Sequence, residues 1–459
     1  MMAWFIHTGF AIAGILFCVF APYGYKAEFC QAIAWCYIAQ NILYFCFNGK
    51  KNFAGFELFF AIAFFFVNFA YPLFYYPERQ NWMFFWRPWD RGIINLATAI
   101  AYMGYTFYIL GVTRWFRMNR PEPDKVEFHV SLEQYILLFL LTVGTYGLYV
   151  VTGGWAAMNE VYHGSGNIKT VGIYSYFYVI FTIGIYLMAM FVYHIPKTKW
   201  WFYLLTMGVC MLMIIATGSR SVVLGVGLIL VVGWNNNVRR FRVWEILGVT
   251  LVGVLGMWFV VVTRYSDSIN VAAVLHSMQT HRFIDVFSDL TINGFNLYAL
   301  VEYGLHHAND WFNGMLIDIA TPIPGMAKYI VEWTGRPYET MCAQDMTTYI
   351  YEGPNSKWGM GCNMIGDAFR MAKYGGVAVS MYLVGWAVKE SYYKSRTNIY
   401  WYVVYYLLVS YAVFYTRGPI LFPPRLLCWS LLLLWGVRSA TTFDWNAFFG
   451  LSKKKEVQA

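Results

Sequence analysis

Charged side chains are scarce in this 459-residue sequence, in which Asp, Glu, Lys and Arg together make up only 12%. A soluble globular domain carries about 25% charged residues, so this chain has too little charge to cover a water-exposed surface of its size. Intrinsic disorder is excluded as well, because it requires low hydrophobicity and high charge. The 8 cysteines and 14 prolines are too few for a disulfide-stapled scaffold or a collagen-like repeat.

Hydrophobic residues are correspondingly abundant, at 59% of the chain, and aromatic residues make up 21%. An α-helix needs about 20 apolar residues to cross the hydrocarbon layer, and this length identifies about 12 spans. We therefore predict an all-α integral membrane protein that forms one polytopic domain over residues 1–459. The predicted spans lie near residues 3–20, 29–47, 54–75, 92–112, 132–152, 171–193, 201–217, 221–236, 245–263, 372–388, 399–416 and 420–437.

Basic residues mark alternate connections between these spans. They are Lys50 and Lys51; Arg114, Arg117, Arg120 and Lys125; Lys197 and Lys199; Arg239, Arg240 and Arg242; Lys389, Lys394 and Arg396; and Arg438 with Lys453, Lys454 and Lys455 in the tail. Cytoplasmic loops are enriched in Lys and Arg, so both termini are predicted to be cytoplasmic. Because these clusters serve as topology anchors beside anionic lipid, the net charge of +9 does not indicate nucleic-acid binding.

The opposite face of the membrane receives one long segment, residues 264–371, which is predicted to be a large periplasmic loop. Long connections are usually functional or disordered, and the many Trp, Tyr, Met and Phe residues here argue against disorder. Its part Val271–Leu305 has apolar residues at helical spacing and is predicted to lie against the membrane surface. Cys342 and Cys362 are the thiols well inside this loop, and the sequence does not decide whether they form a disulfide.

Several signatures of other protein classes are missing. The sequence has no Walker A loop, no Gly-x-Ser-x-Gly nucleophile elbow and no Asp-x-Asp pair for a metal–nucleotide sugar. His306 and His307 with Asp310 lack a specific metal-ligand spacing, so the chemistry is predicted to need no cofactor and no metal. Ionisable residues lie near the span ends, which disfavours an ion-coupled transporter. Asn68 lies deep in a span, where an amide usually joins helices.

Four arginines stand where an apolar span meets the outer face: Arg220, Arg264, Arg417 and Arg425. The positive-inside rule disfavours basic residues on this side, so their position requires another explanation. A guanidinium group is planar, stays charged and binds phosphate with two parallel hydrogen bonds. Several of them together would hold a pyrophosphate, whereas singly each would reach lipid headgroups or pair with a loop carboxylate.

The order of these features resembles the Wzy family, the bacterial polymerases of O-antigen, capsule and enterobacterial common antigen. The likeness is in layout over residues 54–440. It rests on the Thr217-Gly-Ser-Arg220 turn, the Arg264-Tyr265 pair, Arg417 with Arg425, and the segment Gly359–Gly376 that ends the long loop. The resemblance implies a GT-C-like bundle in the bacterial inner membrane, with its site at the periplasmic face.

The activity implied by this resemblance is the polymerisation of undecaprenyl-pyrophosphate-linked repeat units by metal-independent glycosyl transfer. A flippase and a chain-length regulator would be its partners. The four arginines would stabilise the leaving pyrophosphate, with Arg282 and Tyr265 as further substrate-binding residues. Asp367, His281 and Asp285 are the predicted acceptor bases.

Other interpretations remain open at this point. Asp367 could instead pair with Arg370, its neighbour one helical turn later. An O-antigen ligase would use a comparable arginine-rich face. A lipid-linked oligosaccharide flippase would place its cations along a central cavity, and a membrane O-acyltransferase would need a histidine inside the bundle.

Overall fold

The computed structural model describes residues 2–48, 53–78, 91–113, 128–157, 172–195, 200–217, 219–242, 244–251, 253, 287–353 and 359–442, and the regular structure in these ranges is helical. The longer helices are α1 (Met2–Val19), α2 (Ala27–Asn48), α3 (Phe56–Asn68), α4 (Arg91–Val112), α5 (Leu132–Val151), α7 (Tyr174–Phe191), α8 (Trp200–Ala216), α9 (Arg220–Asn237), α18 (Met364–Lys394), α19 (Ile399–Tyr411) and α20 (Pro424–Thr442).

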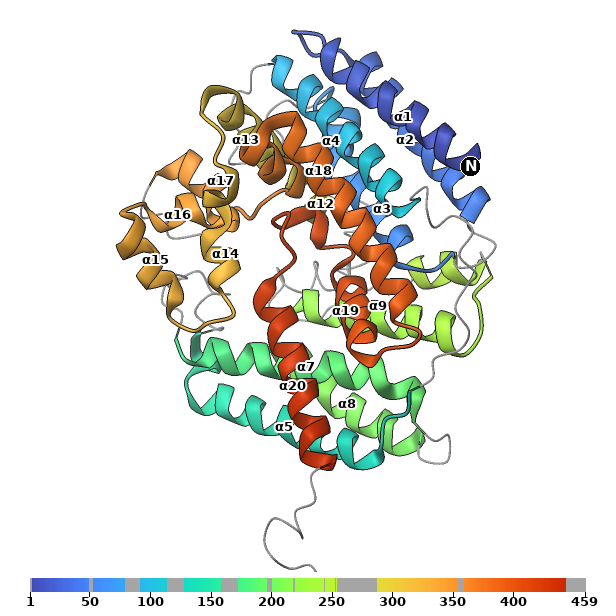
Figure 1. The fold of residues 1–459 in the computed structure, drawn as a ribbon, viewed down its shortest axis with the longest axis vertical. Coiled ribbons are helices and arrows are strands. Elements are labelled where there is room, and N and C mark those ends of the chain that lie inside the picture. The colour runs from blue at the N-terminus through green and yellow to red at the C-terminus, as the bar shows by residue number, and fades with distance from the viewer. Residues whose placement is uncertain are drawn as a thin grey trace, which may run out of the picture.

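Short helices fill much of the remaining chain. They are η1 (Tyr71–Tyr75), η3 (Val192–His194), α12 (Ser288–Thr291), α13 (Gly294–His306), η6 (Trp311–Met315), α14 (Leu316–Ala320), α15 (Met326–Thr334), α16 (Tyr338–Met341), α17 (Ala343–Glu352) and η7 (Tyr415–Arg417). Helices α13 to α17 gather at the left edge of Figure 1, whereas the N-terminus lies at the right. The described part of the predicted 264–371 loop is thus a folded helical layer on one side of the bundle.

The prediction of an all-α chain with membrane-type helices is confirmed in these ranges. Four helical segments are long and apolar enough to cross a membrane: Ala27–Phe47, Gly92–Val112, Leu132–Val151 and Tyr174–His194. Five shorter helices are also apolar, and their outer side chains include Leu212, which is 69% exposed. Apolar side chains on the outside suit a hydrocarbon surrounding. That the chain crosses about 12 times stays a prediction, and most of the predicted span 245–263 lies outside the described residues.

The most extensive helix pair, α4 with α18, is joined by glycines that bring two backbones together. A Cβ atom added at Gly385 of α18 would overlap the carbonyl oxygen of Tyr108, and one added at Gly111 of α4 would overlap that of Tyr382. Small residues allow this close approach, which is the main source of helix–helix attraction in a lipid surrounding. The pair forms the centre of the upper half of the bundle in Figure 1.

Polar links join α3 to α18 at two places along their lengths. At one end of α3 the Asn68 Oδ1 accepts a hydrogen bond of 2.9 Å from Asn363 Nδ2, and Asn363 in turn caps the start of α18. At the other end Lys389 Nζ lies 3.4 Å from Glu57 Oε1. Asn68 therefore has the helix-joining role that the sequence indicates.

The prediction that Val271–Leu305 lies on the membrane surface is wrong for its described part. Helix α13 is buried along most of its length and packs against α18 and α4. Its apolar spacing arises because it belongs to the protein core, and periodicity alone does not distinguish a core-facing helix from a lipid-facing one.

Replacing Gly385 with Ala should destabilise the bundle by about 1–3 kcal/mol, because the added methyl group forces two helix backbones apart. Gly375 lies in the same helix with open space beside its Cα, so Gly375→Ala is the matched control and should leave stability nearly unchanged. Thermal unfolding of the purified variants in detergent measures both. Equal midpoints for the two variants would contradict close backbone packing between α4 and α18.

Candidate functional site

A cavity of about 1180 Å³ lies between the membrane-type helices and the helical layer. Helices α3, α7 and α9 supply apolar wall residues such as Ile62, Val179 and Leu228. The described part of the chain contributes four charged residues to the lining, and all of them lie outside those three helices. They are Asp289 of α12, Asp318 of α14, Arg417 of η7 and Arg425 in the first turn of α20. The cavity is therefore amphipathic, with apolar residues from α3, α7 and α9 and charged residues from α12, α14, η7 and α20.

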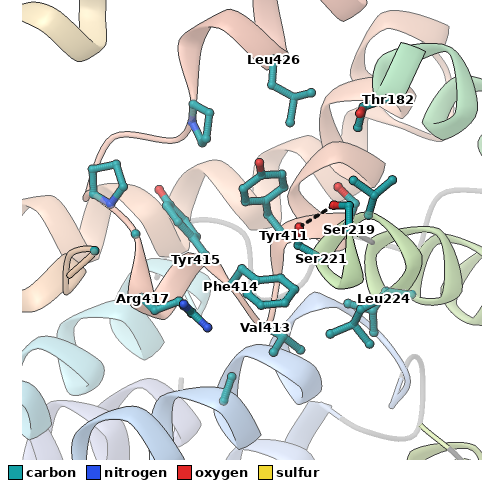
Figure 2. A pocket seen from close by; sticks show the side chains of 18 of the residues that line it. Thr182, Ser219, Ser221, Leu224, Tyr411, Val413, Phe414, Tyr415, Arg417 and Leu426 are labelled. Carbon is teal, nitrogen blue, oxygen red and sulfur yellow. Dashed lines mark hydrogen bonds between the residues drawn. The ribbon is translucent and has the colours of Figure 1, made fainter. Parts of the chain in front are cut away.

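Arg417 is the last residue of η7, the short helix that follows α19. Its Nη1 donates to the backbone oxygen of Asp289 at 3.5 Å, and its guanidinium lies 5.6 Å from the centre of the Phe414 ring. Tyr415 closes the turn by donating its hydroxyl to the carbonyl oxygen of Ile420 at 2.8 Å. Figure 2 shows Arg417 beside Phe414, with Ser219 and Leu224 on the other side of the view.

The Arg425 side chain is positioned by a hydrogen bond from its Nε and by contacts with two aromatic rings. Its Nε donates to the carbonyl oxygen of Thr321 at 2.8 Å, and its guanidinium lies 5.3 Å from the Tyr176 ring and 5.7 Å from the Trp429 ring. Within the described part of the chain its two terminal nitrogens make no hydrogen bond. This arrangement restricts the side chain while leaving those donors for a ligand, which is how a preorganised anion site is built.

Asp318 is the acid that sequence reasoning missed. Only 8% of it is exposed, and its carboxylate accepts hydrogen bonds from the Ala343 amide at 3.1 Å and from the Cys342 thiol at 3.9 Å. Burial raises the pKa of this carboxyl to about 7, and the negative charge of Asp367 adds to the increase, although the Ala343 amide opposes it. The signal for this buried acid in the sequence was its position between two isoleucines, Ile317 and Ile319.

Asp367, the first predicted base, is fully buried and does not line the cavity. One carboxylate oxygen accepts from Arg370 Nη2 at 2.7 Å and the other accepts from the backbone amide of Ile420 at 3.1 Å. The pairing with Arg370, which the sequence left open, is therefore present. Ile420 follows the turn that carries Arg417, so its hydrogen bond to Asp367 holds this turn against α18.

Arg370 joins η6 and α16 of the helical layer to its own helix, α18. Besides Asp367, it donates to Asp310 Oδ2 at 3.2 Å and to the backbone oxygens of Gly314 at 2.8 Å and Thr340 at 3.3 Å. Burial alone would lower the pKa of this guanidinium, but the Asp367 and Asp310 carboxylates raise it above its usual value. The side chain is thus a permanently charged centre of a buried network.

The other predicted site residues are described only in part or not at all. Arg264, Tyr265, His281, Arg282 and Asp285 lie outside the described residues. Of Arg220 only the backbone is described, and it begins α9. Its neighbours Ser219 and Ser221 line the cavity, with their hydroxyls 3.4 Å apart (Figure 2). The cavity therefore brings together Arg417, Arg425 and the backbone turn that carries Arg220.

Histidines and cysteines in the described residues form no group of three metal-ligand side chains. The His307 ring stacks on Tyr303 with 3.9 Å between ring centres, and Asp310 is engaged by Arg370. Cys342 and Cys362 are both free and buried, so they do not form a disulfide.

No protein-family model, curated protein or solved structure matches this chain.

Replacing Asp367 with Asn should cost at least about 3 kcal/mol of stability, because it leaves part of the buried Arg370 charge uncompensated. The matched control is Glu332→Gln, which breaks an exposed ion pair with Lys328 and should have almost no effect. Unfolding midpoints in detergent compare the two. Similar midpoints would show that the Asp367–Arg370 pair contributes little.

Proposed function

We propose that this protein polymerises undecaprenyl-pyrophosphate-linked oligosaccharide repeat units at the periplasmic face of the bacterial inner membrane, as a member of the Wzy family. The observation that carries the proposal is the presence of Arg417 and Arg425 in one cavity that also has apolar wall residues from α3, α7 and α9. A lipid-linked diphosphate has the same two-part character, with two phosphates joined to a long hydrocarbon. The proposal includes about 12 membrane crossings and cytoplasmic termini.

The two arginines would act on the leaving group. Glycosyl transfer breaks the bond between the anomeric carbon and a phosphate oxygen, and negative charge then develops on the pyrophosphate. Fixed cations aimed at developing charge lower the barrier, because they need no reorganisation during the reaction. Arg425 is held by Thr321 and by aromatic rings, and the turn of Arg417 is held by Asp367, which supports such a preorganised role.

The apolar walls would receive the lipid part of the substrate. Ile62 and Ala63 come from α3, and Leu224, Leu228 and Val231 from α9. Each isoprenoid carbon that leaves water for such a surface contributes favourably, at about 0.8 kcal/mol for each buried CH₂ group. Helix α9, which supplies three of these residues, is also one of the apolar helices.

Purified protein reconstituted in lipid vesicles should convert lipid-pyrophosphate-linked repeat units into a ladder of longer glycans without any nucleotide. The ladder should persist in the presence of EDTA, because the arginines supply the positive charge. Gel electrophoresis of the labelled glycan measures the products. A single addition to lipid A, with no ladder, would instead identify a ligase, and movement of intact substrate across the vesicle would identify a flippase.

Arg425→Lys should lower the polymerisation rate about 100-fold, because lysine keeps the charge but loses the planar pair of donors. Arg417→Lys should behave similarly. Arg239→Lys is the matched control, since Arg239 forms an ion pair with Glu245 and is 55% exposed away from the cavity. Initial rates of ladder formation provide the measurement. Normal rates for both cavity variants would refute phosphate binding by paired donors.

A further inference from the structure

We propose that Asp318 is the catalytic base of this cavity and accepts the proton of the sugar hydroxyl that attacks the anomeric carbon. This inference rests on the proposed glycosyl transfer and assigns a role to a residue that the sequence pattern did not identify. Asp318 lines the same cavity as Arg417 and Arg425. Asp289, the other acid that the described residues contribute to the lining, is exposed.

Asp318 lies one helical turn before Thr321, the residue whose carbonyl oxygen binds Arg425. Thr321 donates its hydroxyl to the carbonyl oxygen of Asp318 at 2.7 Å and its amide to the same oxygen at 3.3 Å. The carbonyl oxygen of Thr321 then accepts from Arg425 Nε at 2.8 Å. A base and a phosphate-binding cation are thereby fixed to each other through one residue, as a reaction at the carbon between them requires.

The groups around Asp318 leave it able to exchange a proton. From α16 and α17 it faces Tyr338, Cys342 and Asp345, and from α18 the paired charges of Asp367 and Arg370. Burial raises the pKa of Asp318 to about 7, and it raises the pKa of the Cys342 thiol and of the Tyr338 hydroxyl far above neutrality. Of these cavity residues, Asp318 is therefore the one that changes protonation near neutral pH.

The proposed step balances in atoms and charge. The acceptor hydroxyl oxygen forms a bond to the anomeric carbon while its proton passes to the Asp318 carboxylate. The bond from that carbon to the phosphate oxygen breaks, and its electron pair stays on the pyrophosphate beside Arg417 and Arg425. Asp318 afterwards releases the proton to water, which restores the carboxylate.

Reconstituted protein with the lipid-linked repeat unit tests this assignment. The wild-type rate should rise with pH and level off above about pH 7, since only the ionised carboxylate accepts a proton. Asp318→Asn should lower the rate at least about 100-fold and remove this pH dependence. Glu332→Gln, on the exposed face of α15, should keep both the rate and the profile. A near-normal rate for Asp318→Asn would overturn the proposal.

A stability measurement separates catalysis from a structural role. The amide oxygen of Asn can still accept from Ala343, and above pH 7 Asn removes a buried negative charge, so Asp318→Asn should unfold at the same temperature as wild type or higher. Infrared titration should show a protonated carboxyl band that is present at pH 6, lost by pH 8 and absent in Asp318→Asn. Loss of folding in the variant, or absence of that band in wild type, would overturn the proposal. No ladder from wild type would instead refute the proposed function itself.

Discussion

The buried ion pair between Asp367 and Arg370 is the interaction on which the rest of the site depends. In a chain with so few charges, two opposite charges that are fully buried have to satisfy each other and their neighbouring backbone groups. Arg370 does this by binding η6, α16 and its own helix, and Asp367 by binding the Ile420 amide. The helical layer and the turn of Arg417 are thereby joined into one unit, so the position of a cavity cation is determined by a contact outside the cavity.

A second consequence of the low charge content is the division of the cavity walls. The membrane-type helices contribute apolar and small side chains, because they have almost no ionisable residues to contribute. In the described part of the chain, charges enter the cavity from short helices and helix ends, namely Asp289 of α12, Asp318 of α14, Arg417 of η7 and Arg425 at the start of α20. An amphipathic site therefore follows directly from where the sequence permits a charge, and it matches a ligand that is itself part lipid and part anion.

The sequence predicts some of these features better than others, for physical reasons. Apolar runs of membrane length are a strong signal, so most of the longer helices lie within a few residues of a predicted span, although α18 begins at Met364, eight residues before the predicted start at residue 372. The burial of α13 was not predicted, because a core helix and a surface helix share one periodicity. Arg417 and Arg425 were found because a basic residue on the outer side contradicts the usual charge bias. Asp318 was missed because the sequence does not show that a loop helix will be buried, and burial is what makes this acid unusual. Asp367 was predicted to be an acceptor base, whereas its burial and its contact with Ile420 depend on tertiary structure that the sequence does not show.

The proposed base and the proposed phosphate site should also influence each other. A diphosphate bound near Arg425 brings negative charge to the cavity, and a like charge raises the pKa of a nearby carboxylate. Asp318 would then be a stronger base while the substrate is bound than in the empty cavity. When the pyrophosphate departs, that influence disappears and the carboxyl releases its proton more readily.

Because Asp318 and Arg425 are joined through Thr321, the two functions are coupled by structure as well as by charge. A carboxyl with an ordinary pKa, exposed to water, would respond much less, since solvent screens the charge. Because Asp318 is buried, its pKa would depend on whether the lipid diphosphate is bound in the cavity.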